Sequence, residues 1–357
     1  MKTYDMYIDG QWVQSAGGKT YQAINPAKGE PFALVPEGTR VNATAAGPSS
    51  NLGDDLNRTT ATLREICTRA KVQTKRAVAG LPIASVFSSI ITLPRMPKKD
   101  LNAAVQWEAK KLVPMPVEDM VLDWKLLTPE ADLESKASTA KVARVLLTGA
   151  PKALVSQYLT VFTGAGLELV SLETEAFALI RSLVGNDPSV ILMLDIGAAR
   201  TSMVIVDNGT PVFSRSIDVG GRHLTRAIAE AVGADPVHAE ALKLDLAVLP
   251  TGNAAAAALP SILPAALAPV IQEVRYGVNL YLSQEEHRGR VVEKVVLAGG
   301  SALLPTLTDL FARELNLRVF VGDPWARVIY PIDLRPALDT IGPRFAVAIG
   351  LAMREVV

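Results

Sequence analysis

The sequence predicts an α/β protein that divides into two lobes or several subdomains. A chain of 357 residues can bury a large core and exceeds the usual size of one domain. Hydrophobic residues make up 49% of the chain and aromatic residues only 5%, which favours buried strands of Ala, Val and Leu covered by helices. Apolar runs at residues 190–194 and 291–297 lead into glycine-containing turns and have the length of such strands.

The composition excludes several classes of function. The formal net charge is zero, which argues against electrostatic capture of nucleic acid. The single cysteine, Cys67, has no disulfide partner in the chain, and the three histidines are too scattered for a structural zinc site. Residues 1–9 are polar and acidic, unlike a signal peptide. Three prolines interrupt the longest apolar stretch, 254–271, which suits a packed loop and helix. We expect a cytoplasmic protein without a transmembrane segment.

Residues 1–40 form a leader that differs from everything after it. The run YIDGQWV at 7–13 predicts two strands around an Asp-Gly turn, and further strands are expected at 21–24 and 31–35. Together with INPAKGE and VPEGT, this run resembles the opening of aldehyde dehydrogenases. That family needs a dinucleotide-binding region and a reactive cysteine much further along, whereas Cys67 lies in a helical pattern. We therefore interpret the leader as fused, mis-joined or a chance look-alike, and assign no dehydrogenase residue.

The next part of the chain predicts a short first lobe and an α+β module. Residues 41–55 are small and polar and suit a linker. The expected elements are a helix at 56–69, strands at 76–81, 86–93, 121–127 and 143–148, and helices at 98–112, 151–163 and 175–183. In helix 98–112 an apolar stripe of period near 3.6 is expected to face the core: Leu101, Val105, Trp107, Ala109 and Leu112.

A hairpin at 190–221 is the first candidate site. Strands are expected at 190–194, 203–206 and 212–217, and the segment ends on a glycine pair. At the first turn, Gly197 lets a phosphate approach backbone N–H groups, Thr201 adds a hydroxyl donor, and Asp195 can hold a hydrated divalent cation. The alternative is an ordinary hairpin whose acid and glycine serve only the turn.

Two further motifs follow the hairpin. Helices are expected at 222–232, 236–248 and 269–284, and the second carries Glu240 and Lys243 on one face. An isolated pair of this kind is expected to be a surface ion pair. The strand at 291–297 leads into a Gly-Gly-Ser turn. Such a turn either lets a ligand lie against bare backbone or is only a tight packed turn. A helix at 303–315, a strand at 318–321 and a helix at 345–353 close the chain.

The order of these motifs resembles the second half of the actin/Hsp70/sugar-kinase ATPase superfamily. Longer runs resemble the PilM family of type IV pilus assembly, relatives of the division protein FtsA: LPRMPKKDLNAAVQWEAKKLVPMPVEDMVLDW, LDIGAARTSMVIVDNGTPVFSRSIDVGGRHLTRAIAE, HAEALK and VVLAGGSALLPTLTDLFARELNLRV. The resemblance spans about residues 58–357. It implies an actin-like (ribonuclease H-like) two-lobe fold with an inserted FtsA-type α+β subdomain. The implied parts are a leader at 1–40, first-lobe segments at 41–82 and 166–189, the inserted subdomain at 83–165, a second lobe with the nucleotide motifs at 190–330, and a C-terminal helix region at 331–357.

The resemblance also implies that the chain binds ATP with Mg²⁺. It places Asp195 on the phosphates or the magnesium ion, directly or through water. It gives phosphate contacts to Gly197 and Thr201 and puts Gly220 and Gly221 at the lobe junction. The residues flanking the adenine or lining the adenosine pocket would be Glu240, Lys243, Gly299, Gly300 and Ser301.

The resemblance implies a scaffold, with at most weak ATPase activity. It would dock the N-terminal cytoplasmic tail of PilN and belong to the inner-membrane pilus alignment complex, peripheral to the membrane through protein partners. A groove between the first lobe and the inserted module is the expected peptide site, by strand addition. Self-association is a further option. The alternative is another superfamily member: an FtsA-like division protein, a secretion-system component or a sugar kinase.

One departure from the superfamily concerns the first phosphate hairpin. The superfamily opens with a D-x-G-(S/T) strand pair, whereas here the leader occupies that position and its Asp9-Gly10 turn lacks the following hydroxyl. Each lost charge-assisted hydrogen bond costs about 1.5–3 kcal/mol, so two or three losses weaken affinity by orders of magnitude. We expect impaired or absent ATP binding in this chain.

Overall fold

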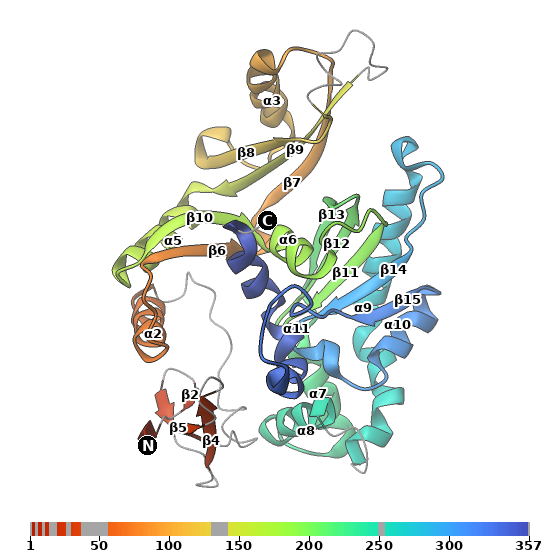
Figure 1. Cartoon of the computed structure of the whole chain (residues 1–357). Coiled ribbons are helices and arrows are strands. Elements are labelled where there is room, and N and C mark those ends of the chain that lie inside the picture. Colours follow the sequence, from red (N-terminus) through yellow and green to blue (C-terminus); the bar gives the residue numbers. More distant parts are fainter. Residues whose placement is uncertain are drawn as a thin grey trace.

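The computed structural model describes residues 56–129, 142–248 and 254–355, together with the backbone of five short strands near the N-terminus (Figure 1). These strands are β1 Lys2–Thr3, β2 Met6–Ile8, β3 Gln11–Val13, β4 Thr20–Asn25 and β5 Glu30–Pro36. They pair with one another, in the orders β1-β5-β4 and β2-β3, which confirms the strands expected in the leader.

The second lobe is built on a five-stranded sheet in the order β13-β12-β11-β14-β15. Its strands are β11 Ile191–Ile196, β12 Thr201–Asp207, β13 Thr210–Ile217, β14 Lys294–Ala298 and β15 Arg318–Val321. β11, β12 and β13 form an antiparallel meander, while β14 and β15 run parallel to β11. The continuous apolar runs of β11 and β12 fit their position because helices cover both faces of the sheet.

The two faces of this sheet bury alternate residues of the same strands. On one face, Leu192, Leu194 and Ile205 share a core with four helices: α7 Gly221–Val232, α8 Pro236–Val248, α9 Ala254–Ser283 and α10 Leu307–Leu315. On the other face, Met193 and Val204 pack on α6 Glu175–Leu179, a π-helical turn Ile180–Val184 and α11 Arg335–Ala352 (Figure 1). This period of two is what a strand buried on both sides requires.

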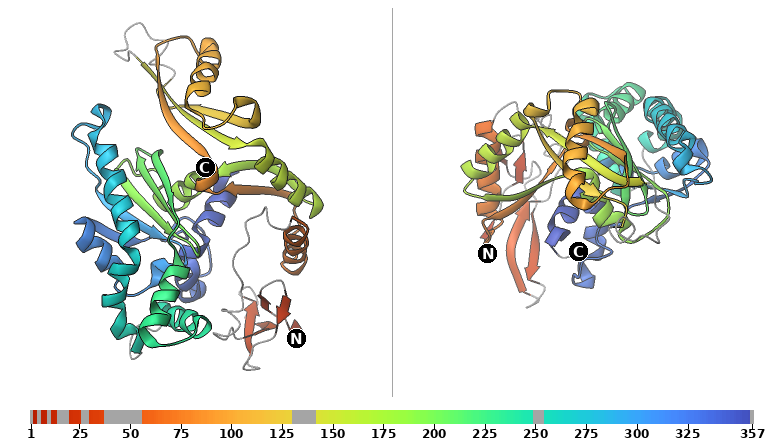
Figure 2. Two further views of the ribbon diagram at one scale, coloured as in Figure 1. Left: turned by 180° about the vertical axis from the view of Figure 1, so that it is seen from behind. Right: turned by 90° about the horizontal axis from the view of Figure 1, so that it is seen from above.

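The first lobe holds a two-stranded parallel sheet of β6 Arg76–Leu81 and β10 Glu168–Thr174. Helix α5 Lys152–Gly164 packs on it through Tyr158, against Ala79 and Leu81, and α2 Leu56–Arg69 lies on α5. The described part of the inserted module has its own sheet, in the order β7-β9-β8, and the helix α3 Lys98–Leu112. Its strands are β7 Phe87–Pro94, β8 Met120–Leu126 and β9 Val142–Pro151. Figure 2 shows this module projecting from the two lobes.

Three expected elements differ in the structure. The closing helix begins at Arg335 rather than 345, and the helix expected at 175–183 changes into the π-helical turn after Leu179. A 3-10 turn at Gly300–Leu303 and a left-handed Thr306 (φ 65°) separate β14 from α10, so that helix starts at Leu307 rather than 303. The other 3-10 turns are Ile83–Ser85, Val117–Asp119, Glu285–His287, Ile332–Leu334 and Met353–Glu355.

The long helix α9 corrects the interpretation of residues 254–271 as loop and helix. One helix of 30 residues contains Pro260, Pro264 and Pro269 in its interior. Each proline removes a backbone hydrogen bond, but the helix buries Leu259, Leu263, Leu267, Val270 and Val274 against the sheet. Tertiary packing therefore overrides the local helix-breaking signal. No helix among the described residues is long and apolar enough to span a membrane.

Helix α3 corrects the expected apolar stripe. Leu101, Val105 and Ala109 are fully buried against the module's sheet, as expected. Trp107 and Leu112, however, are 63% and 41% exposed. The spacing of four between the buried residues defines a narrow face, and Trp107 lies outside it, where the Lys111 ammonium lies 3.5 Å from its ring centroid.

Candidate functional site

The turn between β11 and β12 packs directly on the start of α7. The Gly197 amide donates to the carbonyl of Arg200 at 3.0 Å, and the Gly221 amide donates to the carbonyl of Gly197 at 2.8 Å. A β-carbon on Gly220 would lie 2.6 Å from the Gly197 carbonyl oxygen, so only glycine fits there. Thr201 is fully buried and donates to the carbonyl of Val219 at 2.7 Å. Its hydroxyl therefore fastens the turn to the segment just after β13, and its predicted phosphate contact stays a prediction.

The Gly-Gly-Ser turn after β14 crosses directly over Asp195. Gly299 has a φ of 83°, in the left-handed region that favours glycine. A β-carbon there would lie 2.4 Å from the Ile196 carbonyl oxygen and 2.6 Å from Asp195 Oδ1. The Gly299 amide is held by the carbonyl of Pro343 in α11 at 2.9 Å. Close packing on Ile196 and Asp195 therefore accounts for the glycine at this turn, and the adenosine contact predicted from the sequence stays a prediction.

Glu240 and Lys243 form a buried network rather than the surface ion pair expected for an isolated motif. Lys243 is 8% exposed and donates to Glu240 at 2.6 Å, to the Thr225 hydroxyl at 2.8 Å and to the Gly221 carbonyl at 3.1 Å. The Thr225 hydroxyl also donates to Glu240. Burial lowers the pKa of Lys243, while the Glu240 carboxylate opposes that shift. The network anchors α8 to the first turn of α7.

These contacts link the sequence-predicted residues into one region at the edge of the second-lobe sheet. Gly299 touches Asp195, and a β-carbon on Gly221 would lie 3.0 Å from Ser301 Oγ and 3.4 Å from Lys243 Nζ. The structure brings together Asp195, Gly197, Thr201, Gly220, Gly221, Glu240, Lys243, Gly299, Gly300 and Ser301. Their assignment to phosphate, adenine or adenosine stays a prediction.

Sequence reasoning missed two charged residues of this region. Glu175, the first residue of α6, accepts a hydrogen bond from the Ile83 amide at 3.4 Å, and its charge acts on Asp195. Arg200, in the hairpin turn, lies 3.2 Å from Asp218 and interacts electrostatically with Glu175. An acid at a strand-to-helix junction was the available signal for Glu175. Asp195, on which the charge of Glu175 acts, lies twenty residues further along the chain, so only the fold brings the two acids together.

The electrostatics around Asp195 suit a cation. Burial, followed by the charge of Glu175, raises the pKa of Asp195 to about 7, and burial also raises the pKa of Glu175. Within the described part of the chain, Asp195 has no hydrogen-bond or ion-pair partner. A hydrated Mg²⁺ fits one carboxylate with a second nearby, because it retains waters and prefers oxygen ligands. No cluster of three or more metal-binding side chains occurs among the described residues.

A groove lies between the inserted module and the first lobe. Its cavity measures about 370 Å³. Apolar side chains from both sides line it: Val121, Trp124 and Leu146 from the module, and Leu81, Leu172 and Phe177 from the first lobe and α6. The strands that border the groove, β8 and β10, each pair with a single strand, β9 and β6 respectively, among the described residues. Each therefore offers a free strand edge.

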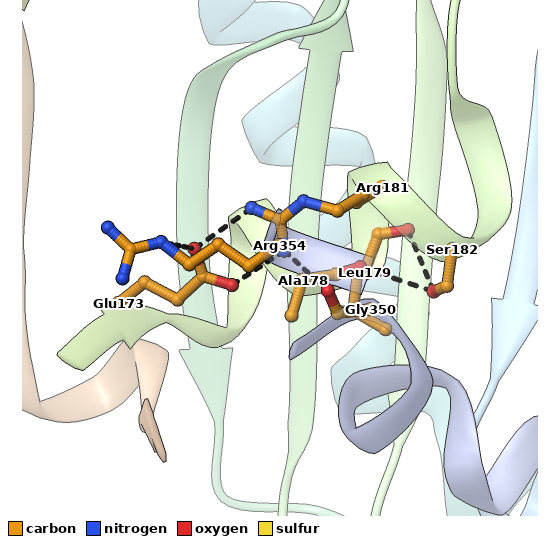
Figure 3. A network of polar contacts seen from close by, with 7 residues as sticks. All are labelled: Glu173, Ala178, Leu179, Arg181, Ser182, Gly350 and Arg354. Carbon is orange, nitrogen blue, oxygen red and sulfur yellow. Dashed lines mark hydrogen bonds and ion pairs between the residues drawn. The ribbon is translucent and has the colours of Figure 1, made fainter. Parts of the chain in front are cut away.

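One end of the groove holds a network of charged side chains (Figure 3). Arg181 donates to the two carboxylate oxygens of Glu173 at 2.7 and 2.9 Å and to the Gly350 carbonyl at 2.5 Å. Arg354 Nε lies 3.6 Å from Glu173, and Figure 3 shows its terminal amino groups turned away from the network. The network ties β10, the π-helical turn and the end of α11 together. The sequence did not predict it.

Comparisons with known proteins identify relatives for most of the chain. Residues 49–356 match the family described as type IV pilus assembly protein PilM. A solved PilM–PilN type IV pilus biogenesis complex is 28% identical and has a TM-score of 0.72, covering 87% of this chain and 90% of that one. MreB5 of Spiroplasma citri bound to ADP is 15% identical with a TM-score of 0.53, over 94% of this chain and 88% of that one. At that identity the likeness shows the actin-like fold alone.

Two dehydrogenases match only short stretches. An aldehyde dehydrogenase of Geobacillus stearothermophilus is 58% identical over 33 residues, which are 9% of this chain and 45% of that protein. A 3,6-anhydro-alpha-L-galactose dehydrogenase of Vibrio sp. (strain EJY3) is 44% identical over 43 residues, 12% of this chain and 9% of that protein. The chain thus spans less than half the length of these curated relatives.

Proposed function

We propose a function from one premise, that this chain belongs to the family of the type IV pilus assembly protein PilM. It acts as an actin-like scaffold at the cytoplasmic face of the inner membrane, within the pilus alignment complex. The N-terminal cytoplasmic tail of PilN docks in the groove between the inserted module and the first lobe. The related PilM–PilN complex and the shape of this groove support the proposal.

The observation that carries the proposal is an apolar groove bordered by two free strand edges. An extended peptide gains main-chain hydrogen bonds by adding to such an edge, and its alternate side chains enter the pockets beside it. Because the edges of β8 and β10 both border the groove, either can accept the peptide. The apolar lining favours a tail with aliphatic side chains on one face.

A titration with a PilN-tail peptide tests this proposal. Val121 lies on β8 at the groove and is 45% exposed, so Val121→Glu should leave the fold intact and weaken binding at least about tenfold. Val142 on β9 is 41% exposed and lies outside the groove lining, so Val142→Glu is the matched control. Binding is measured by calorimetry and by amide chemical shifts. A peptide that leaves the amide spectrum unchanged would refute the proposal.

The proposed nucleotide is magnesium-ATP, bound weakly. Asp195 and Glu175 would hold the magnesium ion, because the charge of Glu175 acts on the buried Asp195 carboxylate. Among the described residues, the first lobe contributes only β6 and β10 to its sheet, with no phosphate hairpin beside them. Calorimetry on the intact chain and on Asp195→Ala tests this. Weak binding that the substitution abolishes supports the site, and equal binding by both proteins contradicts it.

A further inference from the structure

The peptide groove continues past α6 to the second lobe. A second cavity of about 460 Å³ shares three lining residues with the groove: Lys125 on β8, Phe177 on α6 and Arg181 in the π-helical turn. Beyond them it is lined by the Asn208-Gly209 turn between β12 and β13 and by Arg327, which follows β15. A peptide occupying both cavities would therefore contact the module, α6 and the second lobe.

The chemistry of the lining changes along this path. The first cavity is largely apolar, whereas the second is lined by the polar residues Asn186 and Asn208 and by the cations Lys125 and Arg327. Arg327 is fixed in place, because its guanidinium donates to the Arg181 carbonyl at 2.7 Å and lies directly against Gly185. A cation held by backbone contacts is ready to bind an anion at little entropic cost.

The acids of the two cavities are already occupied by protein groups. Asp187 pairs with Lys294 at 2.5 Å, and that hydrogen bond lowers its pKa. Glu173 pairs with Arg181, and Asp123 accepts a hydrogen bond from the Trp124 amide at 2.9 Å. Lys125 and Arg327, in contrast, have no ion-pair partner in the described ranges. As far as the described residues go, the second cavity therefore carries two positive charges without an ion-pair partner.

We propose that this second cavity is a subsite for acidic side chains, so that the groove selects an extended peptide in which a carboxylate pair flanks the apolar stretch. Lys125 and Arg327 bind the carboxylates, and the peptide bridges the module and the second lobe. This inference rests on the proposed function, since it concerns the same groove and the same peptide class.

Peptides of matched sequence test the subsite. Each carries the same Leu- and Val-rich stretch, flanked at one end or the other by a pair of Glu, Gln or Lys residues. At low salt the Glu peptide is expected to bind about fivefold more tightly than the Gln peptide, and the Lys peptide more weakly than both. Raising the ionic strength should reduce these differences, because both cations are exposed.

The variants Lys125→Gln and Arg327→Gln should each reduce the preference for Glu over Gln and leave the Gln peptide's affinity unchanged. Lys110→Gln, at an exposed lysine outside both cavities, is the matched control. Equal affinities for the three peptides at both ends would overturn the subsite while leaving the groove intact. Binding of none of the peptides would overturn the subsite, while the titration with the PilN-tail peptide decides the proposed function separately.

Discussion

Asp195 illustrates at the scale of one residue how a buried acid reduces stability. Its carboxylate lies at the end of β11, under the Gly299 backbone, and its pKa is raised to about 7. An acid whose pKa is higher in the folded protein than in the unfolded chain destabilises the fold once it ionises. This destabilisation is absent below about pH 4 and grows as the pH rises towards 7.

Asp195→Asn is therefore expected to stabilise the protein in the absence of divalent cations. The gain in the free energy of unfolding should be about 1–4 kcal/mol at pH 8 and much smaller at pH 5. Denaturant unfolding at the two pH values measures it. Asp119→Asn, at an exposed acid, is the control and should change little at either pH. A gain independent of pH, or a loss at pH 8, would contradict the buried ionised carboxylate.

Gly350 sets how closely two helices cross between the lobes. A β-carbon on Gly350 in α11 would lie 1.9 Å from the Ala178 carbonyl oxygen in α6, and Arg181 binds the Gly350 carbonyl. Alanine gains about 1 kcal/mol over glycine in helix propensity, but a backbone clash of this size costs more. We expect Gly350→Ala to lower the unfolding free energy by about 1–3 kcal/mol in thermal denaturation. Ala348→Ser, at an exposed position on the same helix, is the control, and a more stable Gly350→Ala would contradict this crossing.

Residue types in the sequence identified the region of the site better than the role of each residue. The acid and the glycines came together because each follows a buried strand, and strand ends meet at one edge of the sheet. The hydroxyl of Thr201 and the Glu240–Lys243 pair also hold neighbouring elements together, which the sequence did not predict, and their ligand roles stay predictions. Their partners are backbone carbonyls and a threonine on other segments, and these distances depend on tertiary packing.

At the scale of elements, α9 shows tertiary packing overriding local helix propensity. Pro269 would be tolerated as the first residue of a helix, as the sequence interpretation placed it, but it lies in the interior of a continuous helix. Because Pro269 is exposed, Pro269→Ala should restore a backbone hydrogen bond without disturbing the core. We expect a gain of about 1–3 kcal/mol in chemical denaturation. A neutral result would support two helices divided at this position. Pro331→Ala, just outside a helix, is the control.

Strong local signals explain which elements the sequence predicted well. Helix α3 and strand β6 have the expected ends because prolines flank α3 and Pro82 follows β6. Trp107 was misplaced because period alone cannot tell a buried aromatic from one at the edge of an amphipathic face. The π-helical turn after Leu179 was missed for a similar reason, since its geometry follows from the close crossing of α11.

At the scale of the whole molecule, we expect the leader to be separable from the actin-like fold, since its described strands pair with one another. A chain that begins at residue 37 should therefore keep a cooperative transition, with a Tm within about 3 °C of the intact protein. It should also bind the PilN-tail peptide with the same affinity, because the described lining of the groove comes from the inserted module, the first lobe, α6, Arg181 and Arg354. Circular dichroism and calorimetry on both chains measure this. Loss of the cooperative transition would show that the leader completes the first lobe, whose two-stranded sheet is small for independent stability.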